Sequence, residues 1–264
     1  MPTVPELENV RLEIAAPLAR ITIHRPDKLN ALHRATLEDL RRAFAACRED
    51  RALRAIVLTG AGPKAFAAGA DIGEISGLGA VEARAFSQAG NALFREIELF
   101  PIPVLGAING FALGGGLELA MACTLRYASD NAKLGQPEVK LGLIPGYGGT
   151  QRLARLVGSG PALQMLLSGE PISAAEALRL GLVNAVLPQA ELLPAIEALA
   201  GKIAANAPLA VQYCLQAVRA GAEMSLEEGL AFEANLFALC CASQDMKEGT
   251  RAFLEKRAPQ FHGV

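Results

Sequence analysis

Hydrophobic and polar residues alternate near the start of the chain and give way to longer apolar runs further on. "VRLEIA" (10–15) and "RITIH" (20–24) alternate on either side of a short turn that contains proline, which predicts a β-hairpin. Apolar runs predict buried strands at 54–60, 101–110 and 124–129. The first half of the chain is therefore predicted to be mixed α/β.

Helical periodicity appears between these strands. Thr36 is a suitable N-cap for a helix to about residue 49, with Leu37, Leu40, Phe44 and Cys47 on one face. A second helix is predicted through 81–100, and a third begins at the glycines 114–116. The segments 61–71 and 133–149, rich in glycine, alanine or proline, are predicted to be loops.

After about residue 150 the pattern becomes almost entirely helical. Ser173 with Glu176, and Ser225 with Glu228, have the spacing of a capping box. We therefore predict an α/β core that carries the active site over residues 1–190 and a helical C-terminal region over 191–264. Helices are expected at 150–158, 161–169, 173–181, 191–207 and through most of the last sixty residues.

Composition limits the classes of function. The chain has 264 residues, 52% of them hydrophobic, and a net charge of −2 with no evident basic stripe, so we expect no nucleic-acid partner. The stretch 99–117 is uncharged and about as long as a membrane span, but its prolines and glycines favour a buried strand, a loop and a helix start. The first ten residues resemble no signal peptide.

Cysteine and histidine usage gives two further expectations. The five cysteines are odd in number and lack CxxC spacing, which predicts buried thiols in a reduced, cytoplasmic compartment. The three histidines have no metal-binding spacing, so we expect no metal. These residues are Cys47, Cys123, Cys214, Cys240 and Cys241, and His24, His33 and His262.

One glycine motif is misleading. "GAGPKA" (60–65) follows a predicted strand and fits the dinucleotide fingerprint G-x-G-x-x-A. Pro63 and the small residues after it do not favour a helix, and no acidic residue ends a second strand about twenty positions later. We therefore do not assign a dinucleotide site here.

The segment "ALGGGLELA" (112–120) opens an apolar helix with three glycines and places Glu118 one turn later. Two interpretations are possible. The glycines either leave backbone N–H groups accessible at a helix N-terminus so that an oxygen atom can approach, or they form a flexible connection. Glu118 favours the first interpretation, because its neighbours Leu117 and Leu119 belong in a core, where an unpaired glutamate is rare.

Two other segments offer partners for this glutamate. Pro137 suits a first helical turn and places Glu138 near another helix start; alone, Glu138 would be an ordinary surface carboxylate. Two carboxylates over one pocket would titrate as a coupled pair, one protonated and one ionised, which suits acid–base chemistry. In "AFAAGADIGEI" (65–75), Ala70 can offer a second N–H, and Asp71 can simply cap a short helix.

Together these segments resemble the enoyl-CoA hydratase/isomerase (crotonase) family. The resemblance implies a spiral of ββα units, a C-terminal helical region used in trimerisation, and an acyl-CoA thioester as substrate, with coenzyme A part of the substrate and no separate cofactor. The segments that carry it are "HRPDKLNAL", "KAFAAGADI", "NGFALGGGLELAMAC", "LGQPEVKLGLIPGYGGTQRL", "SGEPISAAEALRLGLVNAV" and "GTRAFLEKR".

The resemblance also implies roles for individual residues. The N–H groups of Ala70 and Gly115 would form an oxyanion hole, the family's two hydratase glutamates fall on Glu118 and Glu138, and its water-contacting glycine falls on Gly146. Substrate contacts are expected from Ala68, Gly69, Ala70, Asp71, Ile72 and Gly115, with Arg25 and Lys28 near the phosphates of coenzyme A. Tyr147 stands where many relatives have a smaller residue, and His24 replaces a commoner asparagine.

Because both glutamates are present, the predicted reaction is reversible syn addition of water to the 2,3 double bond of a trans-2-enoyl-CoA, giving the 3-hydroxyacyl-CoA. Two alternatives stay open. An isomerase of the same fold would need only one glutamate, and a non-catalytic acyl-CoA-binding or scaffold protein would tolerate the loss of both. We expect a homotrimer or a dimer of trimers, with apolar positions such as Leu226, Leu230, Leu236 and Leu239 in the contact.

Overall fold

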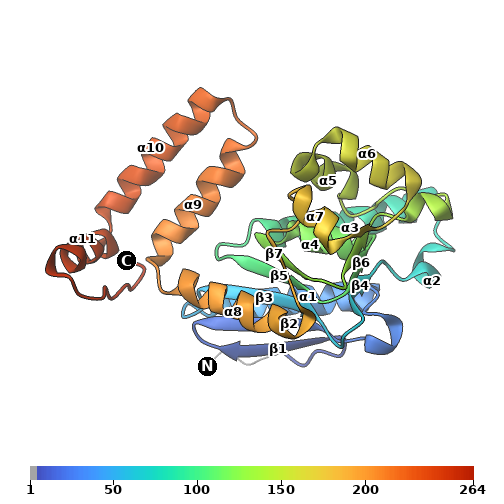
Figure 1. Ribbon diagram of the computed structural model, residues 1–264, viewed down its shortest axis with the longest axis horizontal. Helices are drawn as coiled ribbons and strands as arrows, with labels where there is room; N and C mark the ends of the chain where they lie inside the picture. The colour runs from blue at the N-terminus through green and yellow to red at the C-terminus, as the bar shows by residue number, and fades with distance from the viewer. Residues whose placement is uncertain (1–4) are drawn as a thin grey trace.

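Two β-sheets form the centre of the protein, and a helical arm extends from one side of them (Figure 1). The computed structural model describes residues 5–264. Residues 1–4, which belong to the ten residues in which no signal peptide was expected, lie outside the described part. The α/β core followed by helices agrees with the predicted fold class.

The larger sheet has six strands in the order β1-β2-β3-β5-β7-β10. The first two form the predicted antiparallel hairpin, and every later neighbour pairs in parallel. Parallel pairing explains the continuous apolar runs, because such strands are covered on both faces. The strands are β1 (Val10–Ala15), β2 (Leu18–Ile23), β3 (Ala55–Gly60), β5 (Val104–Ile108), β7 (Leu125–Ser129) and β10 (Ala185–Leu187).

A second sheet of four strands, in the order β4-β6-β8-β9, was not predicted. Two of its strands lie in segments 61–71 and 133–149, where the prediction of loops was wrong. These strands have only two to four residues and are built largely of alanine, glycine and leucine, so they show no alternation. They are β4 (Ala65–Ala68), β6 (Phe111–Leu113), β8 (Lys133–Gly135) and β9 (Ile172–Ser173).

The chain visits the two sheets in turn. Strands β3, β5 and β7 of the large sheet are followed by β4, β6 and β8 of the small sheet, and a helix or helical turn then leads to the next pair. This repeated order is the expected spiral of ββα units. It places the loops after β4, β6 and β8 near one another, because these three strands are neighbours in one parallel sheet.

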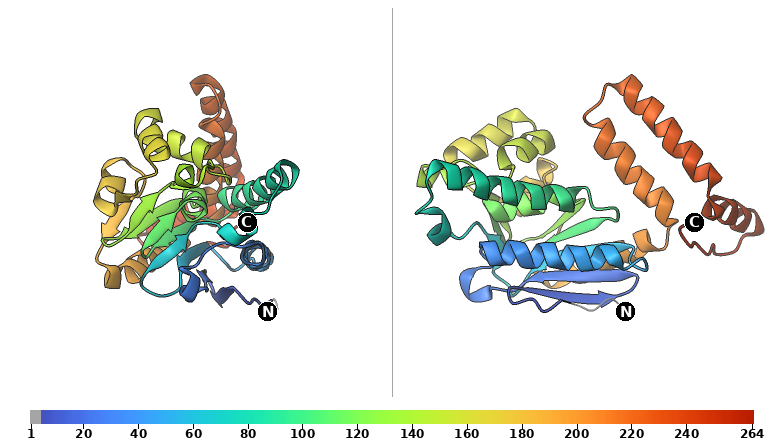
Figure 2. Two further views of the ribbon diagram at one scale, coloured as in Figure 1. Left: turned by 90° about the vertical axis from the view of Figure 1, so that its right-hand side faces the viewer. Right: turned by 180° about the vertical axis from the view of Figure 1, so that it is seen from behind.

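The first long helix, α1 (Arg34–Glu49), begins earlier than predicted. His33 is its N-cap and accepts the backbone N–H of Thr36, which is buried inside the first turn. The predicted apolar face is present, and Phe44 packs edge-on against Phe100. Figure 2 shows α1 beside α3 (Ala80–Glu98), which together cover one side of the sheets.

The remaining helices and helical turns connect the strands or complete the C-terminal half. The predicted capping box at Ser225 and Glu228 is formed, whereas the carboxylate of Glu176 pairs with Arg179 instead of returning to Ser173. The remaining helices and helical turns are η1 (Pro26–Lys28), α2 (Ile72–Ile75), α4 (Gly115–Ala122), η2 (Glu138–Leu141), α5 (Gly149–Val157), α6 (Ser159–Ser168), α7 (Ala174–Arg179), α8 (Gln189–Ala204), α9 (Pro208–Gly221), α10 (Leu226–Ala242) and α11 (Gln244–Glu255).

Helix α8 differs from the helices that follow it. It packs Leu192, Ile196 and Ala200 against Val57 and Leu105 of the large sheet. The helices α9 to α11 then extend away from the core as an arm (Figures 1 and 2). The helical region predicted over 191–264 therefore includes both α8, which packs on the large sheet, and the arm.

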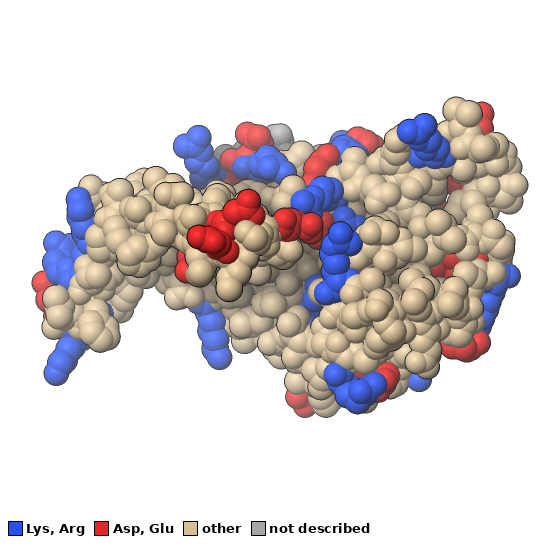
Figure 3. Space-filling view, turned by 90° about the horizontal axis from the view of Figure 1, so that it is seen from above, with Lys and Arg blue, Asp and Glu red and all other residues tan. Residues whose placement is uncertain are grey.

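The arm exposes large apolar side chains. Leu226 is 80% exposed and Phe253 is 82% exposed, and Leu230 and Leu239 are also exposed, whereas Leu236 is buried. Figure 3 shows one face of the molecule, on which basic and acidic side chains are scattered and interleaved and much of the arm is uncharged. A single arm does not cover these apolar residues itself.

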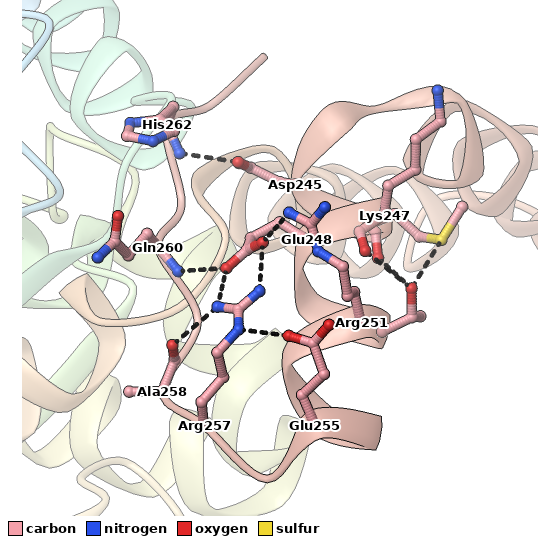
Figure 4. A network of polar contacts seen from close by, with 11 residues as sticks. Asp245, Lys247, Glu248, Arg251, Glu255, Arg257, Ala258, Gln260 and His262 are labelled. Carbon is pink, nitrogen blue, oxygen red and sulfur yellow. Dashed lines mark hydrogen bonds and ion pairs between the residues drawn. The ribbon is translucent and has the colours of Figure 1, made fainter.

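The end of the chain folds back on the arm through a polar network (Figure 4). The carboxylate of Asp245 accepts the backbone N–H groups of His262 and Gly263 at 2.7 and 2.8 Å. The carboxylate of Glu248 binds Arg251 and Arg257 and accepts the N–H of Gln260, and these contacts lower the pKa of Glu248. The last residues are thereby held against α11.

All five cysteines are free thiols. The prediction that they are buried holds for Cys47 and Cys123, but Cys240 is half-buried and Cys214 and Cys241 are exposed. Within residues 5–264, no helix has both the length and the apolar character needed to span a membrane.

Candidate active site

The three glycines that open α4 each have a separate structural reason. Gly114 is the N-cap with a φ of +50°, and a Cβ there would lie 2.5 Å from Oε1 of Glu138. A Cβ on Gly115 would lie 3.4 Å from the backbone nitrogen of Ala70. A Cβ on Gly116 would collide with the carbonyl oxygen of Ala67 in β4. The triplet therefore allows close approach and is not a flexible connection.

Two backbone N–H groups remain free where α4 meets the loop after β4. Gly115 is the first residue of α4, so its N–H has no partner within the helix. Ala70 forms a parallel β-bridge with Leu32, and the hydrogen bonds of that bridge use the carbonyl of Gly69 and the N–H of Asp71, which flank Ala70. Among the described residues neither N–H has an acceptor, and both residues line one pocket. Together they can bind one oxygen atom.

Glu118 lies one turn into α4 with only 1% of its surface exposed. Its Oε1 accepts the backbone N–H groups of Tyr147 and Gly149 at 2.7 and 2.6 Å. Two such hydrogen bonds favour the ionised carboxylate and hold it in one orientation. Because Oε1 is fully engaged, Oε2 is the atom available to a molecule in the pocket.

Glu138 begins the helical turn η2 and lines the same pocket. Gln136, which is fully buried, lies beside it, and with its amide nitrogen toward Glu138 it donates to both carboxylate oxygens at 3.1 Å. The amide oxygen of Gln136 then faces the other way and lies 2.7 Å from the place that a Cβ on Gly149 would occupy. Oε1 of Glu118 lies 2.9 Å from that place. Gln136 thus lies close to both carboxyl groups, a role that the sequence analysis did not find.

Burial raises the pKa of each glutamate to about 7. For Glu118, the hydrogen bond from Gly149 lowers the pKa and the charge of Glu138 raises it, both by less than burial does. For Glu138, a backbone hydrogen bond lowers the pKa, again by less than burial does. Two carboxyl groups with such pKa values over one pocket titrate as a coupled pair, in which one can hold a proton near neutral pH while the other is ionised.

The pocket has a volume of about 410 Å³ and an apolar lining that converges on these groups. Gly146 lies on its wall, and its carbonyl oxygen accepts hydrogen bonds from Ser87 and Asn91 of α3. These two polar residues, one turn apart on α3, were not identified from the sequence. Other lining residues are Ala68, Gly69, Ile72, Ile75, Leu78, Phe86, Leu141, Leu143 and Ile144.

Comparison with known proteins agrees with this geometry. A family model described as enoyl-CoA hydratase/isomerase matches residues 13–264. The short-chain-enoyl-CoA hydratase of Clostridium acetobutylicum is 48% identical over 96% of this chain and 97% of its own length. The crotonyl-CoA hydratase of Syntrophomonas wolfei is also 48% identical, over 96% of this chain and 98% of its own.

Solved structures give the same result. The crystal structure of an enoyl-CoA hydratase from Bacillus anthracis superposes with a TM-score of 0.94 at 39% identity, covering 97% of this chain and all of that one. The chain belongs to the enoyl-CoA hydratase/isomerase family. The resemblance inferred from the six sequence segments is confirmed, and so is the predicted crotonase-type fold.

Three other residues that were predicted to contact the substrate, Asp71, Arg25 and Lys28, are not among those that line the pocket. Asp71 caps α2 by accepting the N–H of Gly73 at 3.2 Å and is not part of the pocket lining, so the simpler interpretation of Asp71 applies. Arg25 points inward, where it donates to the carbonyl of Ala31 and approaches Asp71 at 3.6 Å. Lys28 is exposed. A role for Arg25 and Lys28 with coenzyme A stays a prediction.

The glycine motif at 60–65 has a structural role. Gly60 ends β3 and Ala65 begins β4, so a turn between strands follows the glycines and no helix begins there. The side-chain amide of Asn109 donates to the carbonyl oxygens of Gly60 and Gly62 and ties this turn to the end of β5.

Proposed function

We propose that this protein is an enoyl-CoA hydratase that adds water reversibly to the 2,3 double bond of a trans-2-enoyl-CoA. The observation that carries the proposal is the meeting of the buried Glu118 and the half-buried Glu138 with two free N–H groups in one apolar pocket. A thioester needs the N–H groups, and the addition of water needs a base and an acid on the same side of the double bond.

The N–H groups of Ala70 and Gly115 hold the carbonyl oxygen of the thioester. As water attacks C3, the electrons of the double bond move toward this oxygen and it gains enolate character. Fixed donors in a site that excludes water stabilise such charge strongly, and removal of one donor costs about 3 kcal/mol in other enzymes. The α4 N-terminus adds a favourable dipole.

The two glutamates bind one water molecule between them. Ionised Glu118 takes a proton from this water through Oε2 as the oxygen bonds to C3, and protonated Glu138 gives a proton to C2 as the enolate collapses. Because both groups lie on one side of the bound substrate, the addition is syn. Positioned acid and base groups typically contribute about 10²–10⁴-fold to rate.

Product mass tests this proposal. Purified protein is incubated with crotonyl-CoA, chosen because close relatives carry the names crotonyl-CoA hydratase and short-chain-enoyl-CoA hydratase. A product heavier by one water supports hydration. A product of unchanged mass with a shifted double bond identifies the isomerase alternative, and binding without turnover identifies a non-catalytic acyl-CoA-binding protein.

The exposed apolar residues of the arm support a second proposal, that the protein assembles as a homotrimer or a dimer of trimers. Leu226, Leu230 and Leu239 are exposed on the arm of a single chain, and large exposed apolar side chains in such number are typical of a subunit contact.

We also propose a cytoplasmic location, on the evidence of five free thiols without a disulfide.

A further inference from the structure

Helix α3 lines the pocket only as far as Ser87. Ala83, Phe86 and Ser87, spaced three and four residues apart, face the pocket. The next positions on this helix face are Gly90 and Phe94, both buried and neither among the pocket-lining residues. One helical turn beyond Ser87, which is about 5.4 Å, the pocket is therefore closed.

The group that closes it is the ring of Tyr147. The ring lies 5.4 Å from the rings of both Phe86 and Phe94 and is 2% exposed. A Cβ on Gly90 would collide with Cδ1 and Cε1 of this ring, and a Cβ on Gly115 would lie 3.3 Å from Cδ2. The ring thus fills the space between α3 and the N-terminus of α4.

The backbone of Gly90 does not require glycine. Gly90 lies inside a 19-residue helix, where glycine is less stable than alanine by about 0.5–1 kcal/mol, and it does not have a positive φ. The three heavy atoms nearest to a Cβ at this position all belong to the Tyr147 ring. Gly90 and Tyr147 are therefore a matched pair.

The backbone of Tyr147 is fixed on both sides, so the ring cannot move away easily. Its N–H donates to Glu118 at 2.7 Å and its carbonyl accepts from Arg152 at 2.8 Å. The hydroxyl of Tyr147 is buried without a partner among the described residues. A buried hydroxyl without a hydrogen bond is unfavourable, so the hydroxyl does not explain why a tyrosine stands here. The bulk of the ring does.

We propose that Tyr147, seated over Gly90, ends the acyl-binding part of the pocket and restricts the substrate to short-chain acyl thioesters. This inference rests on the proposed function in taking an acyl-CoA as the ligand. An acyl chain bound at Ala70 and Gly115 and running along α3 past Ser87 meets the ring, so further methylene groups find no apolar surface in that direction.

The test compares four-carbon and ten-carbon substrates. Hydration of crotonyl-CoA and trans-2-decenoyl-CoA, and binding of butyryl-CoA and decanoyl-CoA by calorimetry, are measured for the wild type, Tyr147→Ala and Tyr147→Phe. We expect Tyr147→Ala to raise the ratio of kcat/KM for the long over the short substrate at least tenfold, the effect of burying about two further methylene groups. Tyr147→Phe keeps the ring and should keep the wild-type ratio.

Several results would overturn the inference. One is an unchanged ratio in folded Tyr147→Ala, and another is an equal change in Tyr147→Phe. If Tyr147→Ala does not fold, the wild type alone decides: its affinity should not increase from butyryl-CoA to decanoyl-CoA, and a steady increase contradicts the inference. A wild type that binds short acyl-CoA selectively but hydrates nothing refutes the proposed reaction and leaves this inference standing.

Discussion

Gly115 faces Ala70 across the pocket so closely that a Cβ on the glycine would lie 3.4 Å from the alanine's backbone nitrogen. One residue opens a helix and the other follows a strand of the small sheet, and they lie 45 positions apart in sequence. Their juxtaposition depends on the parallel pairing of β4 with β6, which places the ends of the two strands side by side.

This relationship gives a matched pair of variants. Gly115→Pro removes the N–H, whereas Gly115→Ala keeps it, and both place a Cβ near Tyr147 and Ala70. Proline is tolerated at the first position of a helix, so both variants should fold. We expect Gly115→Pro to hydrate crotonyl-CoA at least about 10²-fold more slowly than Gly115→Ala. Equal rates in two variants that melt alike would exclude a role for this N–H.

Proline at Gly116 is not a useful control for damage to the helix start. Any Cβ at this position collides with the backbone of Ala67, so the substitution would disturb the packing of α4 on β4. The alanine variant at position 115 is the better comparison, because it adds the same atom in the same place.

The raised pKa of Glu138 predicts a specific pH dependence of stability. Its folded pKa of about 7 lies above the ordinary value of 4.5, so between these pH values the folded state holds a proton that the unfolded chain releases. Raising the pH through this window therefore lowers the free energy of unfolding. Glu138→Gln removes this effect and should be more stable than the wild type at pH 8, by up to roughly 3 kcal/mol.

Thermal melting at two pH values checks this expectation. The difference between Glu138→Gln and the wild type should be present at pH 8 and should nearly vanish at about pH 3.5, where the wild-type carboxyl is mostly protonated in both states. A gain of the same size at both pH values would show that burial of the charge is not its cause. The carboxylate of Glu138 thus lowers the free energy of unfolding, as residues needed for function often do.

The pairing of Gly90 with Tyr147 predicts a change of sign. In the wild type, Gly90→Ala forces its methyl group into the ring and should destabilise the protein by about 1–3 kcal/mol. In Tyr147→Ala the space is open, and the same substitution should stabilise by up to about 1 kcal/mol through helix propensity. Denaturation of the four proteins measures the coupling, and the same sign in both backgrounds would contradict the pairing.

The arm predicts the state of assembly. Light scattering at micromolar concentration should give the mass of a trimer or a hexamer of the 27.6 kDa chain. Replacing exposed Leu226 and Leu230 by glutamate should lower the apparent mass, because a charge in an apolar contact is unfavourable. Replacing Glu227, a neighbouring exposed residue, by glutamine is the control. A monomeric wild type would contradict the proposal of assembly.

The sequence predicted the parts of the fold that have a clear period or a long apolar run. The hairpin of β1 and β2, the buried strands β3, β5 and β7, and most long helices lie close to the expected positions. The small sheet was not predicted because its strands "AFAA", "FAL" and "KLG" are too short to show a periodic pattern. They are strands because their neighbours pair with them, a tertiary effect that local sequence does not contain.

The candidate site divides in a similar way. Burial of Glu118 was predictable from its apolar neighbours, and Gly115 from its place at a helix start. The roles of Gln136, Ser87 and Asn91 depend on which distant residues they contact, so their residue type alone gave no signal. The fit of Tyr147 over Gly90 joins positions 57 residues apart and is visible only in the folded protein.

In the proposed reaction, Glu118 and Glu138 act together on one water molecule. Replacing either by glutamine keeps the size of the side chain and removes the acid or the base, so each single variant should fold and lose most hydration of crotonyl-CoA. Because the two residues act as a unit, the double variant should be little slower than the slower single variant.

The measurement that tests this most directly is the rate at which the wild type, Glu118→Gln, Glu138→Gln and the double variant form the product that is heavier by one water. We expect this product from the wild type, a loss of at least about 10²-fold in each single variant, and little further loss in the double variant. Hydration at the wild-type rate by either folded single variant would show that the two glutamates do not act together on one water molecule.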